Sequence, residues 1–272
     1  MHRIFIISKM NLLLQDKIII VTGGSKGIGL AITHLLADEG AIPFIVSRDE
    51  RSILQTIEEI EKKGGKCSYA LAELTDPQQG QNAIEKAISE FKTVHGLVNN
   101  AGINDGVGLE NGNANYFMDS LKKNLVHYYV MAQACLPYLK ENKGSIVNIG
   151  SKVSLTGQGG TSGYAAACGG RNALTREWAV ELLQYSIRVN AVVVAESFTP
   201  LYEKWINTFP NPNEKLNQIQ NKIPFEKRMT TPEEIANTVA FLLSEKSSHT
   251  TGQLVYVDGG YVHLDRSLNP SL

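Results

Sequence analysis

The sequence predicts a single α/β domain in which helices cover both faces of a parallel β-sheet. Short apolar runs alternate with longer amphipathic stretches, the pattern of repeated strand–helix–strand crossovers. A glycine-rich segment follows the first apolar run, and no internal repeat or low-complexity linker divides the chain. With 272 residues, 43% of them hydrophobic, the chain can bury one sizeable core.

The first half of the chain contains three expected strand–helix pairs. Ile18–Thr22 is continuously apolar, as expected of a strand buried on both faces. Ile28–Glu39 places its apolar residues on one stripe and is followed by Gly40, a helix-stop signal. By the same reasoning the next elements are strand Phe44–Ser47, amphipathic helix Ser52–Lys63 ending at Gly64-Gly65, strand Ser68–Ala72 and helix Pro77–Phe91.

The second half continues the alternation. Strands are expected at Leu97–Asn99 and Ser145–Ile149, separated by one long helix, Tyr116–Lys140. Helix Tyr164–Leu183 and strands Arg188–Val194 and Leu254–Val257 complete the sheet. Residues 199–228 carry four prolines around Trp205 and Phe209, so they are expected to form a lid over the substrate rather than a second domain.

Composition excludes several classes of protein. A net charge of −1 offers no basic face for nucleic acid, and no apolar stretch is long enough to span a membrane. Three scattered cysteines form no disulfide framework or metal cluster, which favours reduced thiols in the cytoplasm. Residues 1–9 are interpreted as a dispensable extension of domain 10–272, because Met10 is a plausible alternative start.

The segment Thr22–Gly29 (TGGSKGIG) joins the first strand to the first helix. Glycines at such a junction permit a tight turn and let the backbone approach a pyrophosphate at the helix N-terminus. The sequence therefore predicts a Rossmann-type fold that binds a nicotinamide dinucleotide. The expected contacts in this loop come from Gly23, Ser25, Lys26, Gly27, Ile28 and Gly29.

The end of the second strand indicates which dinucleotide binds. NAD-binding Rossmann proteins carry an acid about 20 residues past the loop, whereas this strand ends in Ser47-Arg48. A guanidinium can hold a 2′-phosphate, and Lys26 adds a second cation on the same side. These residues favour NADP over NAD; the alternative is that Arg48 is an ordinary solvated surface charge.

The spacing TGxxxGxG, together with NNAG at residues 99–102, resembles the short-chain dehydrogenase/reductase superfamily. The resemblance extends over nearly the whole chain. It implies cofactor contacts from Glu73 and Leu74, which stand where the family has Asp-Val or Asp-Leu. It implies further contacts from Asn100, Ala101, Gly102, Ser197 and Thr199.

The same resemblance implies the catalytic residues. Ser151 ends a strand and Tyr164 lies thirteen residues on, matching the family's serine and its proton-exchanging tyrosine. Asn124 matches the helix asparagine whose carbonyl side carries the family's relay water. The family has a lysine four residues after the tyrosine, on the same helix face, which lowers the tyrosine pKa and binds the nicotinamide ribose.

Position 168, where that lysine is expected, is Cys168. Three interpretations are open. The cysteine is natural and another residue compensates for the lost lysine, or it is natural and inactivates the protein, or it was introduced on purpose. Lys152 is expected to point away from Tyr164, and Arg171 to lie about 10 Å along the helix axis, too far for direct contact. Cys168 itself has no histidine placed to activate it as a nucleophile. We therefore expect a protein that binds dinucleotide but turns over slowly.

A second departure lies after the strand Arg188–Val194. The family's Pro-Gly, which lines the nicotinamide, is replaced by Val194-Ala195. Restoring a backbone N–H at this point is expected to loosen the carboxamide pocket.

Longer strings, such as NNAGINDGVGLE at residues 99–110, resemble bacterial L-fucose dehydrogenases. This resemblance implies oxidation of an aldose to its lactone by a homotetramer packed through its long helices. Ketoreduction of a steroid or of an acyl carrier fits less well, and a non-catalytic dinucleotide-binding protein is the alternative. Weak candidates for sugar contacts are Asn104, Asp105, Gln158, Glu196 and Trp205; no metal ligands are expected.

Overall fold

The computed structural model describes residues 11–264. Its strands are β1 (Ile18–Thr22), β2 (Ile42–Ser47), β3 (Ser68–Leu71), β4 (Gly96–Asn99), β5 (Ser145–Ser151), β6 (Arg188–Val194) and β7 (Leu254–Val257). Its α-helices are α1 (Gly27–Asp38), α2 (Glu50–Lys62), α3 (Pro77–Phe91), α4 (Ala114–Leu121), α5 (His127–Asn142), α6 (Ser162–Glu181), α7 (Pro200–Ile206), α8 (Pro212–Gln220) and α9 (Pro232–Leu243). Residues 1–9, which were predicted to form a dispensable extension, lie outside the described residues.

The strands form one parallel sheet in the order β3-β2-β1-β4-β5-β6-β7. The strand order reverses between β1 and β4, the position at which open α/β sheets bind ligands beyond the carboxyl ends of their strands. All strands run the same way, which brings their carboxyl ends to one edge of the sheet. The α/β Rossmann-type prediction is thereby confirmed.

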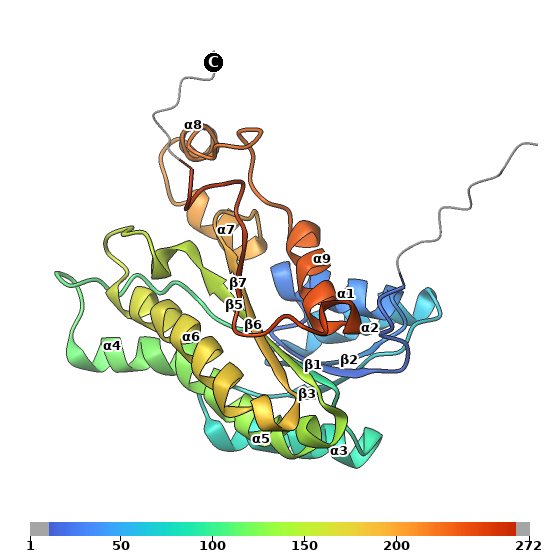
Figure 1. The fold of residues 1–272 in the computed structure, drawn as a ribbon. Helices are drawn as coiled ribbons and strands as arrows, with labels where there is room; N and C mark the ends of the chain where they lie inside the picture. Colours follow the sequence, from blue (N-terminus) through green and yellow to red (C-terminus); the bar gives the residue numbers. More distant parts are fainter. Residues whose placement is uncertain (1–10, 265–272) are drawn as a thin grey trace, which may run out of the picture.

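Helices cover both faces of the sheet (Figure 1). On one face α3, α5 and α6 pack through residues such as Met131, Leu139 and Trp178. On the other face α1 and α9 pack through residues such as Ile32 and Val239. Burial on both sides explains why the central strands are continuously apolar. None of the helices described is long and apolar enough to cross a membrane.

The expected long helix over residues 116–140 is interrupted. A π-helical turn at Lys122–Val126 separates α4 from α5. Such turns insert an extra residue and redirect backbone groups, frequently at functional sites. Periodicity does not reveal the interruption, because the apolar pattern continues through it.

Helix α9 and the helices of the proposed lid are additional elements that were not predicted from the sequence. Thr231 and Glu234 form a reciprocal capping box with Pro232 at the first position, a start signal that the sequence displays as TPEE. Within residues 199–228 the chain forms α7 and α8, which lie above the carboxyl edge of the sheet in Figure 1.

Candidate active site

The loop between β1 and α1 has the tight geometry that its glycines predict. Gly23 and Gly27 adopt φ values of +64° and +54°, a region that favours glycine. A Cβ on Gly29 would lie 2.1 Å from the Gly23 carbonyl oxygen. The loop backbone therefore packs against itself at the N-terminus of α1, leaving no room for a side chain at this position.

The segment after β4 supports this loop. The Asn100 side chain donates hydrogen bonds to the carbonyls of Thr22 (2.9 Å) and Gly23 (3.3 Å). The Thr22 hydroxyl accepts from the main-chain N–H groups of Asn100 and Ala101, at 2.9 and 3.1 Å. The NNAG segment thus fixes the turn from the neighbouring strand.

The two cations expected at a 2′-phosphate are both paired with acids. Arg48 donates to Glu73 at 2.9 Å, and Lys26 pairs with Asp49, lowering the pKa of that carboxyl to about 2. Arg48 and Lys26 are exposed, so each pair is weak and can open. Ser47 lies 3.4 Å from Ser25, side chain to side chain.

Ser151 and Tyr164 meet at the carboxyl edge of the sheet. Ser151 is the last residue of β5, and Tyr164 lies in the first turn of α6. The Tyr164 hydroxyl lies near the side chains of Ser151, Cys168 and Arg171, each of which influences its pKa. The structure therefore brings the serine and the tyrosine predicted from sequence close to each other.

Tyr164 is held in its neutral form by its surroundings. Burial raises the pKa of Tyr164 to about 12, the Cys168 thiol adds to the rise, and Arg171 opposes it. Burial also raises the pKa of the Cys168 thiol. Cys168 lies one turn after Tyr164 and is fully buried, but it contributes no positive charge.

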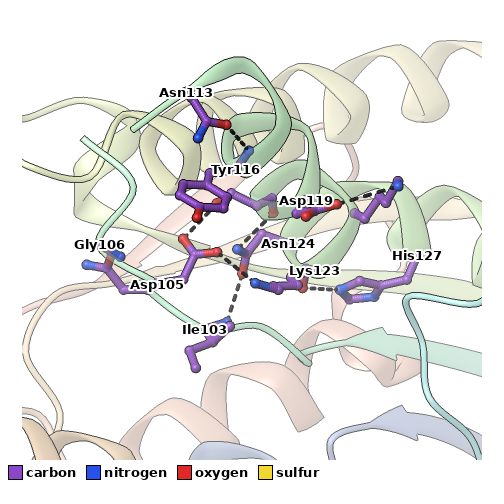
Figure 2. Close-up of polar contacts among 12 residues, drawn as sticks. Ile103, Asp105, Gly106, Asn113, Tyr116, Asp119, Lys123, Asn124 and His127 are labelled. Atoms are coloured by element: carbon purple, nitrogen blue, oxygen red, sulfur yellow. Dashed lines mark hydrogen bonds and ion pairs between the residues drawn. The ribbon is translucent and has the colours of Figure 1, made fainter. Parts of the chain in front are cut away.

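Asn124 lies in the π-helical turn and links three segments. Figure 2 shows its side chain next to the loop after β4, where Oδ1 accepts from the Ile103 N–H at 2.8 Å. Its Nδ2 donates to the Ser120 carbonyl at 3.0 Å. Its main-chain carbonyl, which the family resemblance assigns to a water, accepts from Arg171 Nε at 2.6 Å.

The expectation that Arg171 lies too far from Tyr164 is wrong. Its guanidinium carbon is 5.7 Å from the centre of the Tyr164 ring. The 10 Å separation holds for the helix axis only. An arginine side chain leans toward the helix N-terminus and is long enough to cover most of that separation. The contact could have been predicted from the sequence, because positions 164 and 171 share one face of the helix.

Lys152 does point away from Tyr164, as expected. Its ammonium forms an ion pair with Glu196 and lies 4.0 Å from the centre of the Tyr261 ring. Both partners of the ion pair are largely buried, which joins the ends of β5 and β6. Glu196 is therefore engaged by protein rather than free for a sugar.

The other candidate sugar contacts are dispersed. Asp105 accepts from Ser120 at 2.8 Å and lies 3.5 Å from Lys123, while Asn104 accepts from the Gly106 N–H at 3.3 Å (Figure 2 includes the Asp105 contacts). Gln158 is exposed. Trp205 packs edge-on against Tyr202 and Phe209 in the proposed lid. Contacts among the described residues do not join these five into one site.

At the expected nicotinamide end, Ser197 and Thr199 follow β6. The Ser197 hydroxyl is buried and has no hydrogen-bond partner among the residues of the structure that are described. Thr199 caps α7 through the Tyr202 N–H (3.3 Å) and would contact a Cβ on Gly27 at 3.2 Å. This segment therefore lies beside the glycine loop. Val194, which replaces the family proline, is buried at the end of β6.

Comparison with known proteins assigns the family. A family model described as enoyl-(acyl carrier protein) reductase matches residues 23–262. The 3-oxoacyl-[acyl-carrier-protein] reductase FabG of Thermotoga maritima is 34% identical over 250 residues, covering 92% of this chain and 99% of the relative. The chain belongs to the short-chain dehydrogenase/reductase superfamily. Proteins of this superfamily are oxidoreductases that bind NAD(P) and act on small molecules.

Two further similarities bear on the subgroup of short-chain dehydrogenases. The crystal structure of Cj0485 dehydrogenase superposes with a TM-score of 0.91 at 45% identity, covering 96% of this chain and 99% of that one. L-fucose dehydrogenase of Bos taurus is 30% identical over 245 residues, covering 90% of this chain and 88% of the relative. The superfamily is thus shown, whereas L-fucose dehydrogenase is a distant similarity.

Proposed function

We propose that this chain is an NAD(P)-dependent dehydrogenase that oxidises an aldose, such as L-fucose, to its lactone, with activity limited by Cys168. The observation that carries the proposal is that Ser151 and Tyr164 lie near each other at the carboxyl edge of the sheet, the edge at which the glycine loop also lies. The limit on activity comes from one position, because the residue one turn after Tyr164 is Cys168 and not a lysine.

The residues present fit a dinucleotide. The loop Gly23–Gly29 places its backbone against the N-terminus of α1, and a Cβ at Gly29 would fill it. The buried Ser197 hydroxyl, which has no hydrogen-bond partner within residues 11–264, provides a free polar group in the segment after β6. When bound, the nicotinamide would accept the hydride. Residues proposed to hold the dinucleotide are Gly23, Ser25, Lys26, Gly27, Ile28, Gly29, Ser47, Arg48, Glu73, Leu74, Asn100, Ala101, Gly102, Tyr164, Ser197 and Thr199.

The chain's own groups move the proton. The Ser151 hydroxyl would donate a hydrogen bond to the substrate oxygen and hold it beside Tyr164. The Tyr164 phenolate would accept the hydroxyl proton as the carbon–hydrogen bond of the aldose C1 breaks and the carbonyl of the lactone forms. A tyrosine with pKa near 12 is rarely ionised at neutral pH, so the reaction should be slow there.

We favour NADP over NAD, because Arg48 is exposed at the end of β2 and can turn from Glu73 toward a 2′-phosphate. Lys26 would have to leave Asp49 in the same way. The acids beside both cations compete with the phosphate, which makes the preference a moderate one.

The sugar substrate rests on the long strings shared with L-fucose dehydrogenases and on the distant match to that enzyme from Bos taurus. The match to FabG supports the alternative, reduction of a 3-oxoacyl thioester. We favour the sugar because the net charge of −1 suggests no basic patch for an acidic carrier protein. The segment 199–228 would close over the substrate as a lid.

Cys168 also supports a different class of function, a dinucleotide-binding protein without catalysis. Such a protein would act as a redox-state sensor or an assembly subunit. The raised pKa of Tyr164 favours this alternative, and the retained Ser151, Tyr164 and Asn124 oppose it.

One experiment separates the two functions. Dinucleotide binding is measured by calorimetry, and dinucleotide reduction is followed with L-fucose, L-galactose and D-arabinose over neutral to alkaline pH. Turnover that increases with pH supports the dehydrogenase. Binding without turnover for any aldose supports the non-catalytic alternative, and absence of binding contradicts both.

We also propose that the protein is a homotetramer of the cytoplasm. Tyr129 on α5, Val180 on α6 and Leu183 just after α6 are 51%, 70% and 59% exposed, giving an apolar surface for subunit contact. The cysteines Cys67, Cys135 and Cys168 are all unpaired thiols, consistent with a reducing compartment. Light scattering of the purified protein tests the assembly.

A further inference from the structure

A buried arginine lies where the site lacks a lysine. Arg171 is 2% exposed, and its guanidinium lies 4.4 Å from the Tyr128 ring centre and 5.7 Å from that of Tyr164. It begins one turn beyond Cys168 on α6 and extends back toward the helix N-terminus. Its charged head therefore lies in the same region as the Tyr164 hydroxyl.

The guanidinium is held in a defined orientation. Nε donates to the Asn124 carbonyl at 2.6 Å, Nη1 to the Ile149 carbonyl at 3.2 Å, and Nη2 to Asn124 Oδ1 at 3.4 Å. A guanidinium has five N–H donors, so two donors remain beyond these three bonds, and the group lies 5.7 Å from the centre of the Tyr164 ring. The side chain is thus fixed by neutral acceptors and aimed at the phenol.

The neighbouring segments leave room for this side chain. A Cβ on Gly102 would lie 2.9 Å from Arg171 Nη2 and 3.0 Å from Asn124 Oδ1. Asn124, whose carbonyl accepts from Arg171 Nε, lies within the π-helical turn that interrupts the long helix. Both the glycine of NNAG and the interruption of the long helix therefore accommodate the guanidinium.

No carboxylate of the described residues 11–264 forms an ion pair with Arg171. A buried cation without an anion is costly, and an arginine cannot relieve that cost by losing its proton. An anion forming at the Tyr164 oxygen would remove the imbalance. The unbalanced charge thus opposes the rise that burial causes in the pKa of Tyr164.

We propose that Arg171 is a positioning residue that stabilises the Tyr164 phenolate in place of the lysine missing at position 168. This inference rests on the proposed function, because it assumes that the Tyr164 phenolate is the working form. It gives the site partial compensation rather than full repair, since the pKa of Tyr164 remains near 12.

The prediction depends on which groups face Tyr164. Lys152 is engaged by Glu196 and does not contribute. The titratable or charged groups that surround Tyr164 and Arg171 are Cys168 from α6 and His127 and Tyr128 from α5. His127 is neutral near physiological pH because burial, and then Arg171, lower its pKa to about 4. Arg171 is therefore the one permanent cation in this group.

The test is a direct titration of Tyr164 that does not require turnover. The full chain is labelled with tyrosine carrying ¹³C at the ζ carbon, and the Tyr164 signal is assigned from Tyr164→Phe. The chemical shift is followed from neutral to alkaline pH in wild type, Arg171→Lys and Arg171→Gln. Glutamine keeps a donor for Asn124 but removes the charge. Arg188→Gln is the matched control, because Arg188 is partly buried and donates to main-chain carbonyls away from the site.

We expect the phenolate population at a given alkaline pH to fall at least about tenfold in Arg171→Gln and to stay closer to wild type in Arg171→Lys. Arg188→Gln should leave it unchanged. An unchanged Tyr164 titration in a folded Arg171→Gln protein overturns the inference. If Arg171→Gln does not fold, Arg171→Lys is compared with the double variant Arg171→Gln/Cys168→Lys, which carries its positive charge at position 168 instead of position 171. The same loss of phenolate in these two folded proteins overturns the inference. Turnover with L-fucose is recorded separately, so an inactive protein with the expected titration refutes only the proposed function.

Discussion

Replacing Cys168 with lysine should restore much of the missing activity. With a Tyr164 pKa of about 12, only about one molecule in 30,000 carries the phenolate near pH 7.5. An ammonium about 4–6 Å from an acid lowers its pKa by about 1–3 pH units, which would raise the phenolate population about 10- to 1000-fold. The new phenolate is a weaker base, and Arg171 repels the added charge. We therefore expect kcat to rise about 10- to 100-fold near pH 7.5.

The pH dependence distinguishes this cause from a general improvement in folding. The advantage of Cys168→Lys over wild type should shrink as the pH rises, because wild-type Tyr164 then ionises without help. Initial rates of dinucleotide reduction by an aldose give both profiles. Cys168→Met, which fills similar space without charge, is the matched control. Equal gains in Cys168→Lys and Cys168→Met, or a gain independent of pH, would refute the electrostatic reasoning.

Three further predictions follow from the geometry. Gly29→Ala should weaken dinucleotide binding in calorimetry at least about tenfold, whereas Gly157→Ala, whose Cβ would meet nothing within 4 Å, should not. Arg48→Ala should weaken NADP binding about tenfold and leave NAD binding nearly unchanged; an equal loss for both would show that Arg48 does not bind the 2′-phosphate. Burial lowers the pKa of His127 from 6.5 to about 4, so between these values the unfolded chain binds more protons and stability falls as pH falls. Urea unfolding should therefore lose on the order of 3 kcal/mol over that range, and His127→Gln should lose less; identical slopes would contradict the assignment.

Much of the fold was predictable because its signals are local. Strands β6 and β7 and helix α3 have the bounds that the apolar runs and flanking residues indicate. The glycine loop was predictable for the same reason, since its conformation depends on residues that are adjacent in sequence. The π-helical turn at residues 122–126 was not, because it depends on contacts of Asn124 with Ile103 and Arg171, far away in the chain.

The sequence indicated which residues belong to the candidate site, but it did not indicate the contacts that these residues make with one another. The family resemblance pointed to Ser151 and Tyr164, and the structure places these two residues near each other. The reach of Arg171 was missed because axial rise was considered without the direction of its side chain. The pairing of Arg48 with Glu73 was also missed, since no sequence pattern shows which exposed charges select each other across strands.

The most direct measurement is the rate of dinucleotide reduction by L-fucose as a function of pH in wild type and in Tyr164→Phe, with dinucleotide binding confirmed in both. The wild-type rate should increase about tenfold per pH unit well below the Tyr164 pKa, and Tyr164→Phe should bind dinucleotide without turnover. A wild-type rate that is independent of pH, or that survives in Tyr164→Phe, would contradict a proton transfer through this tyrosine.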